Sequence, residues 1–244
     1  MPALRVSGTW PGVVRFQRGW ASATALPWND SGAWASLRLD RGGAGFLTAA
    51  ALWLRSHGAE EVRSPAVDQR TGGVWERAGF KEKERFRLFE RDLSRPLFEP
   101  ERVVDQIGLI PFRLVEIDDD AFAPEYRLGQ LGLESSLDAT REAVVLTVGD
   151  PVAGFCIVGS ADVASFLQRI AVDPQSQRQG IGTDLIRAAM KWARKRGAWS
   201  MSLNTHRHNP AAGLYAREGF EESPHGVCLF AFDQSSAAVG EVKG

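Results

Sequence analysis

The sequence predicts an α+β fold in which a mixed sheet is flanked by helices. The first indication is an apolar run, Phe166 to Val172, that stops at Asp173-Pro174 and is followed by a glycine-bearing turn and a helix. The second is a pair of strand-like runs, Ala143 to Val148 and Val152 to Gly159, joined by the hairpin turn Gly149-Asp150-Pro151. The third is that strand, glycine turn and helix recur in the first half of the chain.

The helix after the turn is expected from Ile181 to Arg196. Leu185, Ala189 and Trp192 form one apolar stripe at the spacing of a helix that packs on a sheet. The turn itself, Gln177 to Gly182, contains two glycines two residues apart. Its backbone amides converge without Cβ obstruction, and the helix adds its positive end. The turn is therefore predicted to hold a pyrophosphate.

Two motifs stand in order around a strand expected from Ala198 to Asn204. They are Gln177-x-x-Gly180-x-Gly182 and Asn209-x-x-Ala212-x-Leu214-Tyr215, the second closed by Gly219-Phe220. Together they resemble the GNAT superfamily of acyl-CoA-dependent N-acyltransferases. The resemblance implies a mostly antiparallel mixed sheet, acetyl-CoA as the acyl-donor cosubstrate and an amine acceptor.

The resemblance also implies site residues. The pantetheine arm would pair with the strand at Ile170, Ala171 and Val172. The remaining cofactor-binding residues are Gln177, Arg178, Gln179, Gly180, Ile181, Gly182, Thr183 and Asn209.

Tyr215 is the predicted catalytic residue. Asn209 is a good N-cap and Pro210 suits the first helical position, so a short helix is expected from Pro210 to Arg217. The resemblance assigns Tyr215 the role of proton donor to the departing CoA thiolate, and a phenol held within hydrogen-bond reach can supply that proton. The alternative is a tyrosine that only packs between helix and sheet.

The residues leave the general base unassigned. Asp118 to Asp120 are expected to open a helix, where the dipole favours carboxylates, and the alternative is that they recruit a cationic amine. His206 and His208 precede the Tyr215 helix. No Asp, Glu or Cys stands near them in sequence, so no metal site is predicted. A base role for one of these imidazoles is the better alternative.

The first half of the chain repeats this plan in degenerate form. Asp40 to Gly45 is a glycine turn that leads into a helix, and the segment from Val74 to Phe80 parallels the one from Leu214 to Phe220. Trp75 stands in the place of the tyrosine and cannot donate an acidic proton.

Two further departures weaken the first turn. Gln69 stands in the place of Asn209, and Asp40 puts a negative charge where a phosphate would bind. We therefore predict two GNAT-like halves, of which the first does not catalyse and has a disfavoured CoA site at Gly43 and Gly45.

The expected boundaries follow from these patterns. Residues 1–93 form the degenerate half, residues 94–102 a proline-containing linker, residues 103–233 the complete acetyl-CoA-binding domain, and residues 234–244 a flexible tail. Within the second half, strands are expected at Leu109 to Ile117 and, last, at Gly226 to Phe232.

Composition narrows the class of protein. The 244 residues carry a net charge of −1, which gives no indication of nucleic acid or of an acidic membrane surface. Cys156 and Cys228 are too few for a disulfide framework, and the N-terminus has no apolar signal core. A cytoplasmic protein is expected. The pattern gives no oligomeric state.

Three functions remain open from the sequence. The first is an N-acetyltransferase that acts on a primary amine of an unidentified small-molecule or peptide acceptor by direct attack. The second is a non-catalytic acyl-CoA-binding regulatory module. The third is a tandem small-metabolite acyltransferase resembling mycothiol synthase. Acceptor specificity resides in helices and loops that have no transferable code.

Overall fold

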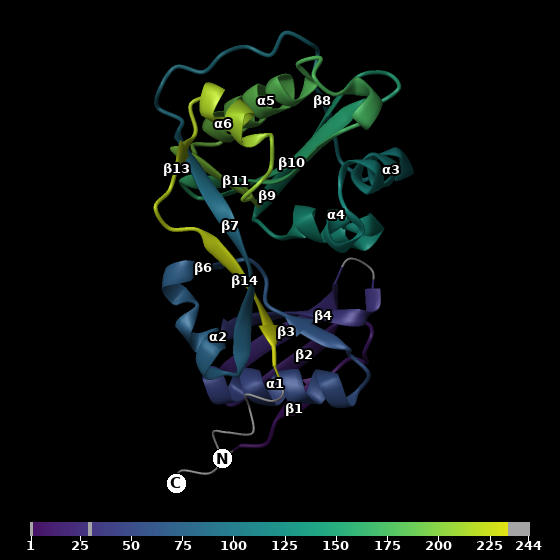
Figure 1. The fold of residues 1–244 in the computed structure, drawn as a ribbon, viewed down its shortest axis with the longest axis vertical. Coiled ribbons are helices and arrows are strands. Elements are labelled where there is room, and N and C mark those ends of the chain that lie inside the picture. The colour runs from purple at the N-terminus through teal and green to yellow at the C-terminus, as the bar shows by residue number, and fades with distance from the viewer. Residues whose placement is uncertain (1, 29–30, 234–244) are drawn as a thin grey trace. The chain divides into compact units, whose positions relative to one another are not determined.

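Figure 1 shows the fold of the chain as a computed structural model that describes residues 2–28 and 31–233. The chain forms two compact units. Residues 2–87 and 225–233 belong to the first unit, and residues 88–224 form the second. The predicted tail, residues 234–244, lies outside the described residues.

The first unit is built on a mostly antiparallel sheet. Its strands are β1 (Arg5–Ser7), β2 (Val14–Arg18), β3 (Ala21–Trp28), β4 (Ser31–Arg41), β5 (Glu61–Arg63), β6 (Val67–Asp68), the first part of β7 (Phe80–Asp92) and β14 (Val227–Phe232). β1 to β4 are antiparallel neighbours in chain order, whereas β5 is parallel to β4. β14 lies between β5 and β7 and is antiparallel to both.

The helices of the first unit are α1 (Ala44–Ser56), η1 (Gln69–Thr71) and α2 (Gly73–Arg77). α1 buries Phe46, Leu47 and Leu54 together with two alanines, whose small side chains let the helix approach the sheet closely. Trp75 on α2 completes the same apolar core.

The strands of the second unit form a mixed part of the 14-stranded sheet. Its strands are β8 (Asp105–Ile107), β9 (Glu142–Val148), β10 (Gly154–Ala161), β11 (Ala164–Val172), β12 (Ser200–His206) and β13 (Glu221–Glu222), with the last part of β7 between β12 and β13. β8 to β11 are antiparallel neighbours, and β12 is parallel to β11. This is the α+β class with a mixed sheet that the sequence predicts.

Helices cover both faces of the sheet within the second unit. They are α3 (Phe112–Ala121), η2 (Pro124–Tyr126), α4 (Gly129–Asp138), η3 (Pro174–Ser176), α5 (Ile181–Lys195) and α6 (Ala212–Arg217). In Figure 1, α5 and α6 lie on one side of β9, β10 and β11, and α3 and α4 lie on the other. Alternate residues of β10 enter the two cores: Cys156 packs on the α5 side and Phe155 on the α3 side. This explains why β10 is apolar at almost every position.

The final strand belongs to a different unit from the one we predicted. Residues 226–232 do form a strand, but β14 pairs with β5, β6 and β7 of the first unit. The last part of β7, assigned above to the first half, lies in the second unit and pairs with β13. The predicted boundaries at 93 and 103 therefore do not coincide with the compact units. Strand signals are local, whereas the partner of a strand is chosen by distant residues.

The predicted strand from Leu109 to Ile117 is also wrong. Pro111 precedes a helix, α3, which buries Leu114, Val115, Ile117 and Asp118 at helical spacing. A short apolar run does not distinguish a strand from a buried helix by periodicity alone. As a result, Asp118 to Asp120 lie at the end of α3 and do not open a helix.

Across residues 2–28 and 31–233, every helix is too short or too polar to cross a bilayer.

Candidate active site

The glycine turn ends in the N-terminus of α5, as the sequence predicts. Arg178 and Gly180 both have left-handed backbones, with φ of 60° and 88°, and Gly180 is the N-cap of the helix. The first intrahelical bond is donated by the amide of Asp184 to the carbonyl of Gly180, at 3.1 Å. The amides of residues 181–183 precede that bond. Amides without an intrahelical partner at the positive end of a helix are the groups that bind anions, so the start of this 15-residue helix is a candidate anion site.

The side chains of the predicted turn residues fall into two groups. Gln177, Arg178 and Gln179 are exposed, although Gln177 Nε2 donates to the carbonyl of Val172 at 3.2 Å and Gln179 Nε2 to that of Gln175 at 3.5 Å. Ile181 is 5 % exposed and packs into the core of the second unit. Ile181 can therefore offer a ligand only its backbone amide. Thr183 is half-buried.

The buried carboxylate of Asp184, which the sequence reasoning missed, stabilises the glycine turn through Arg102. Asp184 is 1 % exposed and accepts hydrogen bonds from Arg102 Nη1 and from the amide of Glu101, both at 2.7 Å. Arg102 Nη2 donates to the carbonyl of Gln179 at 2.5 Å. The positive end of α5 favours this carboxylate, and the pair brings a guanidinium to the glycine turn.

The edge of β11 that faces β12 is open beyond its first residues. The two parallel strands pair over Ala164–Phe166 and Ser200–Ser202, and the rest of these described strands diverges. On its other edge β11 pairs with β10 as far as Val172, with a bulge at Gln168. A free strand edge presents N–H and C=O groups to which an extended ligand can pair. Ile170, Ala171 and Val172 lie on this open edge.

Helix α6 lies beside the glycine turn. A Cβ added to Gly182 would lie 3.3 Å from Leu214 Cδ2 on α6 and 3.9 Å from Val172 Cγ2 on β11. The structure therefore brings together the end of the open strand, the glycine turn and the helix of Tyr215. These elements come from three separate parts of the sequence.

Asn209 is not the N-cap of α6 that its residue type predicted: the N-cap is Ala211, and Asn209 stabilises the turn that leads into the helix. Its Oδ1 accepts the amide of Ala211 at 2.8 Å, and its Nδ2 donates to Thr205 Oγ1 at 2.6 Å. The side chain thus joins the end of β12 to α6. These two bonds give Asn209 a structural role in shaping the site.

Tyr215 is buried on α6. It is 4 % exposed and its ring lies 5.8 Å from that of Phe89 and 6.2 Å from that of Phe220. Burial raises the pKa of the phenol to about 12, because the phenolate would lose its hydration. Tyr215 is therefore protonated at neutral pH and able to donate a hydrogen bond.

The opposite face of the open edge carries a different set of polar side chains. Arg169 on β11 forms a bidentate ion pair with Asp118 on α3, at 2.6 and 2.8 Å, and Asp118 is fully buried. Asp118 is therefore a structural carboxylate, and it does not reach an acceptor. His206 at the end of β12 contacts the ring of Tyr126, whereas His208 is exposed in the following loop.

Comparison with known proteins agrees with this geometry. Residues 139–222 match the family model described as "Acetyltransferase (GNAT) domain". The aminoglycoside N(6')-acetyltransferase type 1 of Klebsiella aerogenes is 28 % identical over 150 residues, which cover 56 % of this chain and 96 % of that protein.

Solved structures share the fold over most of the chain. A tandem GNAT protein from the clavulanic acid biosynthesis pathway has a TM-score of 0.61 at 16 % identity and covers 90 % of this chain and 81 % of its own. A GCN5-related N-acetyltransferase from Kribbella flavida has a TM-score of 0.56 at 15 % identity, with 97 % and 92 % covered.

Residues 139–222 of the second unit thus match a GNAT domain. This match and the acetyltransferase relative support acyltransferase activity, and the fold of the chain is similar to that of a tandem GNAT protein.

Proposed function

We propose that the protein is an N-acetyltransferase that transfers the acetyl group of acetyl-CoA to a primary amine by direct attack. The observation that carries the proposal is the convergence of the open edge of β11, the α5 turn and α6 around Gly182. The acetyltransferase relative in Klebsiella aerogenes supports an amine acceptor.

The donor is placed by two kinds of backbone group. The pyrophosphate binds the amides of residues 181–183, with Arg178 and Arg102 as the nearby cations. The pantetheine arm pairs with β11 along Ile170 to Val172, which carries the thioester into the gap between β11 and β12.

The transfer step then follows ordinary acyl-transfer chemistry. The lone pair of a neutral amine attacks the thioester carbonyl carbon, and the oxyanion that forms is held by a main-chain amide near Val172. The C–S bond breaks with its electron pair on sulfur. Tyr215 gives the thiolate its proton and regains one from the new amide nitrogen through solvent. The products are the N-acetyl amide and CoA.

A calorimetric titration with acetyl-CoA, followed by an amine panel, tests this proposal. We expect one site per chain and acetylation of at least one cationic amine among an aminoglycoside, spermidine and a lysine-containing peptide. Binding without turnover would favour a non-catalytic acyl-CoA-binding module instead. If a folded protein bound no acetyl-CoA, the proposal would be wrong.

A further inference from the structure

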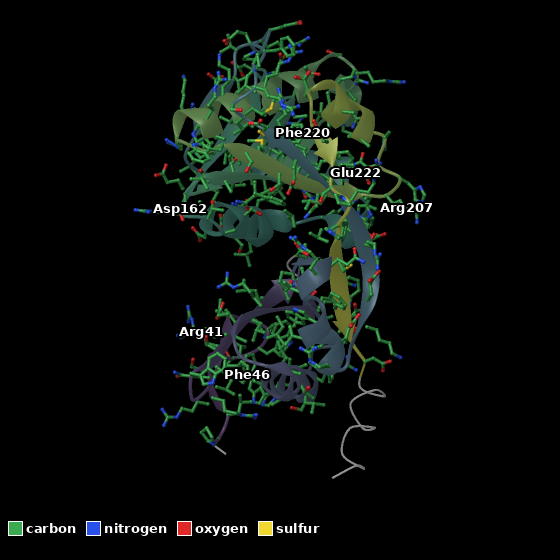
Figure 2. All side chains as sticks on the ribbon, turned by 90° about the vertical axis from the view of Figure 1, so that its left-hand side faces the viewer. Arg41, Phe46, Asp162, Arg207, Phe220 and Glu222 are labelled. Carbon is green, nitrogen blue, oxygen red and sulfur yellow. The ribbon has the colours of Figure 1, made fainter. Side chains whose placement is uncertain are left out.

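The two faces of β12 have different surroundings. Met201, Leu203 and Thr205 are buried, and the first two pack in the core beneath α5 and α6. Because side chains alternate along a strand, His206 points to the opposite face, the one covered by α3 and α4. Figure 2 labels its neighbour Arg207 on the side of the second unit opposite Asp162, which lies in the hairpin before β11.

His206 stands level with the proposed thioester. The last β11–β12 pair joins Phe166 to Ser202, and His206 follows Ser202 by as many residues as Ile170 follows Phe166. The bulge at Gln168 shortens the rise of β11 by about one residue, so His206 reaches the level of Ile170 to Ala171 on the other side of the gap. Tyr215 approaches from the α6 side, so the imidazole and the phenol lie on opposite faces of the sheet.

One aromatic ring orients the imidazole of His206. The centroid of the Tyr126 ring lies 4.2 Å from it at an interplanar angle of 70°, an edge-to-face contact. Tyr126 ends η2, in the segment of residues 122–128 that joins α3 to α4. The position of His206 therefore depends on the position of that segment.

The buried Asp118–Arg169 pair anchors this segment to β11. Arg169 Nη2 donates to the carbonyl of Tyr126 at 2.9 Å, and Asp118 Oδ2 accepts the amide of Leu128 at 2.9 Å. The Arg169 guanidinium also lies 3.4 Å from the centroid of the Phe122 ring. The two charges neutralise each other and the carboxylate accepts three hydrogen bonds, so the pair fixes the segment without adding net charge beside His206.

We propose that His206 is the general base that deprotonates the acceptor ammonium, and that Tyr126 is a positioning residue held by the Asp118–Arg169 pair. This inference rests on the proposed N-acetyltransferase function and adds the residue that prepares the acceptor. An ammonium group has no lone pair for attack, so one N–H proton passes to the imidazole nitrogen and the N–H electron pair becomes the nucleophile. The imidazolium returns the proton to solvent after transfer.

Substitution of His206 by glutamine tests the proposal with two nucleophiles. The first is the best cationic amine of the panel, and the second is hydroxylamine, which is neutral near pH 7 and needs no base. We expect His206→Gln to lower kcat for the cationic amine about 100-fold. Turnover of hydroxylamine, corrected for the uncatalysed reaction, should change by less than about threefold, with acetyl-CoA affinity unchanged. His208→Gln, in the exposed loop, is the matched control and should leave both rates unchanged.

Each other outcome has a definite meaning. An equal loss with both nucleophiles would show that His206 acts structurally, and an unchanged rate with the cationic amine would exclude it as the base. Turnover of hydroxylamine alone by the unmodified enzyme would also overturn the inference, because a base would have no ammonium to act on. If the unmodified enzyme bound acetyl-CoA and acetylated neither nucleophile, the proposed function itself would fail.

A second variant tests the positioning role. Tyr126→Ala should lower kcat for the cationic amine about tenfold and spare hydroxylamine, and Tyr126→Phe, which keeps the ring, should restore the rate. A loss that Tyr126→Phe does not restore, or one that extends to hydroxylamine, would contradict positioning through the ring.

Discussion

The two units place an aromatic residue in the same local setting but differ in one chemical group. Trp75 on α2 is 3 % exposed and Tyr215 on α6 is 4 % exposed. Each is followed by a left-handed glycine, Gly79 with φ of 87° or Gly219 with φ of 83°. Each also contacts the phenylalanine after that glycine, with ring centroids 5.0 and 6.2 Å apart. Ring packing is therefore common to both units, and the hydroxyl is found only in the second.

The two glycine turns differ in a related way. Gly43, the N-cap of α1, has an extended backbone with φ of −126°, and a Cβ at Gly43 or Gly45 would have no neighbour within 4 Å. In the second unit the N-cap Gly180 is left-handed, and Gly182 is closely flanked by α6. The turn of the second unit is thus packed against α6 and β11. The turn of the first unit also joins a strand to a helix, but Gly43 and Gly45 lack such neighbours.

The turn before the short helix also differs from our expectation. We placed Gln69 in the position of Asn209, but Asp68, the N-cap of η1, is the residue whose carboxylate accepts a backbone amide, that of Arg70, at 2.8 Å. Asn209 accepts the amide of Ala211 in the same way, so the side chain that stabilises the turn stands one residue earlier in the first unit.

The largest expected effect comes from Tyr215→Phe. The ring remains, so folding should be preserved, and kcat should fall about 100-fold, or about 2.7 kcal/mol of transition-state stabilisation, with acetyl-CoA affinity unchanged. Steady-state kinetics together with calorimetry measure both quantities. Trp75→Phe is the matched control: it enlarges a cavity in the first unit and should reduce stability but not kcat per folded molecule. Equal losses of turnover and affinity in Tyr215→Phe would mean that the tyrosine only binds.

Alkaline unfolding provides an independent test of Tyr215. Burial raises its pKa to about 12 in the folded protein, above the ordinary value of about 10, so the unfolded chain releases this proton first as the pH rises. The resulting stabilisation is present below pH 10 and is lost between about pH 10 and 12. By urea denaturation, the unmodified protein should lose about 2 kcal/mol more than Tyr215→Phe over this range. Parallel curves for the two proteins would contradict the burial of the phenol.

A smaller effect separates the two glycine turns. Gly182→Ala puts a methyl group between Val172 and Leu214 and should weaken acetyl-CoA binding about tenfold, or about 1.4 kcal/mol. Gly45→Ala meets open space in the first turn of α1, so it should leave binding unchanged and raise stability by about 0.5–1 kcal/mol. Calorimetry and thermal unfolding measure the pair. If Gly45→Ala weakened binding as much as Gly182→Ala, the donor site would have to include the first unit.

The parts of the fold that were predictable from sequence carry local signals. The helix α5 was predicted to within one residue of its end because its apolar stripe is regular. The turn before it was recognisable because left-handed positions favour glycine, although Arg178, with φ of 60°, gave no such signal. The short helix with Tyr215 was recognisable from Asn209 and Pro210, although it starts at Ala212.

Long-range pairing could not be predicted in the same way. Arg102 lies in a stretch read as a linker, and its contact with Asp184 joins residues 82 positions apart. Nothing in the acidic run of residues 118–120 distinguished Asp118 from its neighbours, and only the fold shows that Asp118 pairs with Arg169. Likewise, the strand signal of residues 226–232 contained nothing that specified the first unit as its partner. In each case the sequence gives the residue type, and only the folded chain gives the partner.

The place of β14 has a consequence for the order in which the protein is completed. β14 fills the sheet of the first unit between β5 and β7, and it is contributed by residues 227–232, which the ribosome makes after the whole of the second unit. The first unit is therefore the last whose strands can all be paired, although its synthesis begins before that of the second unit. Until then β5 and β7 lack their shared neighbour, and the nascent chain carries two unpaired strand edges that can pair with the wrong partner.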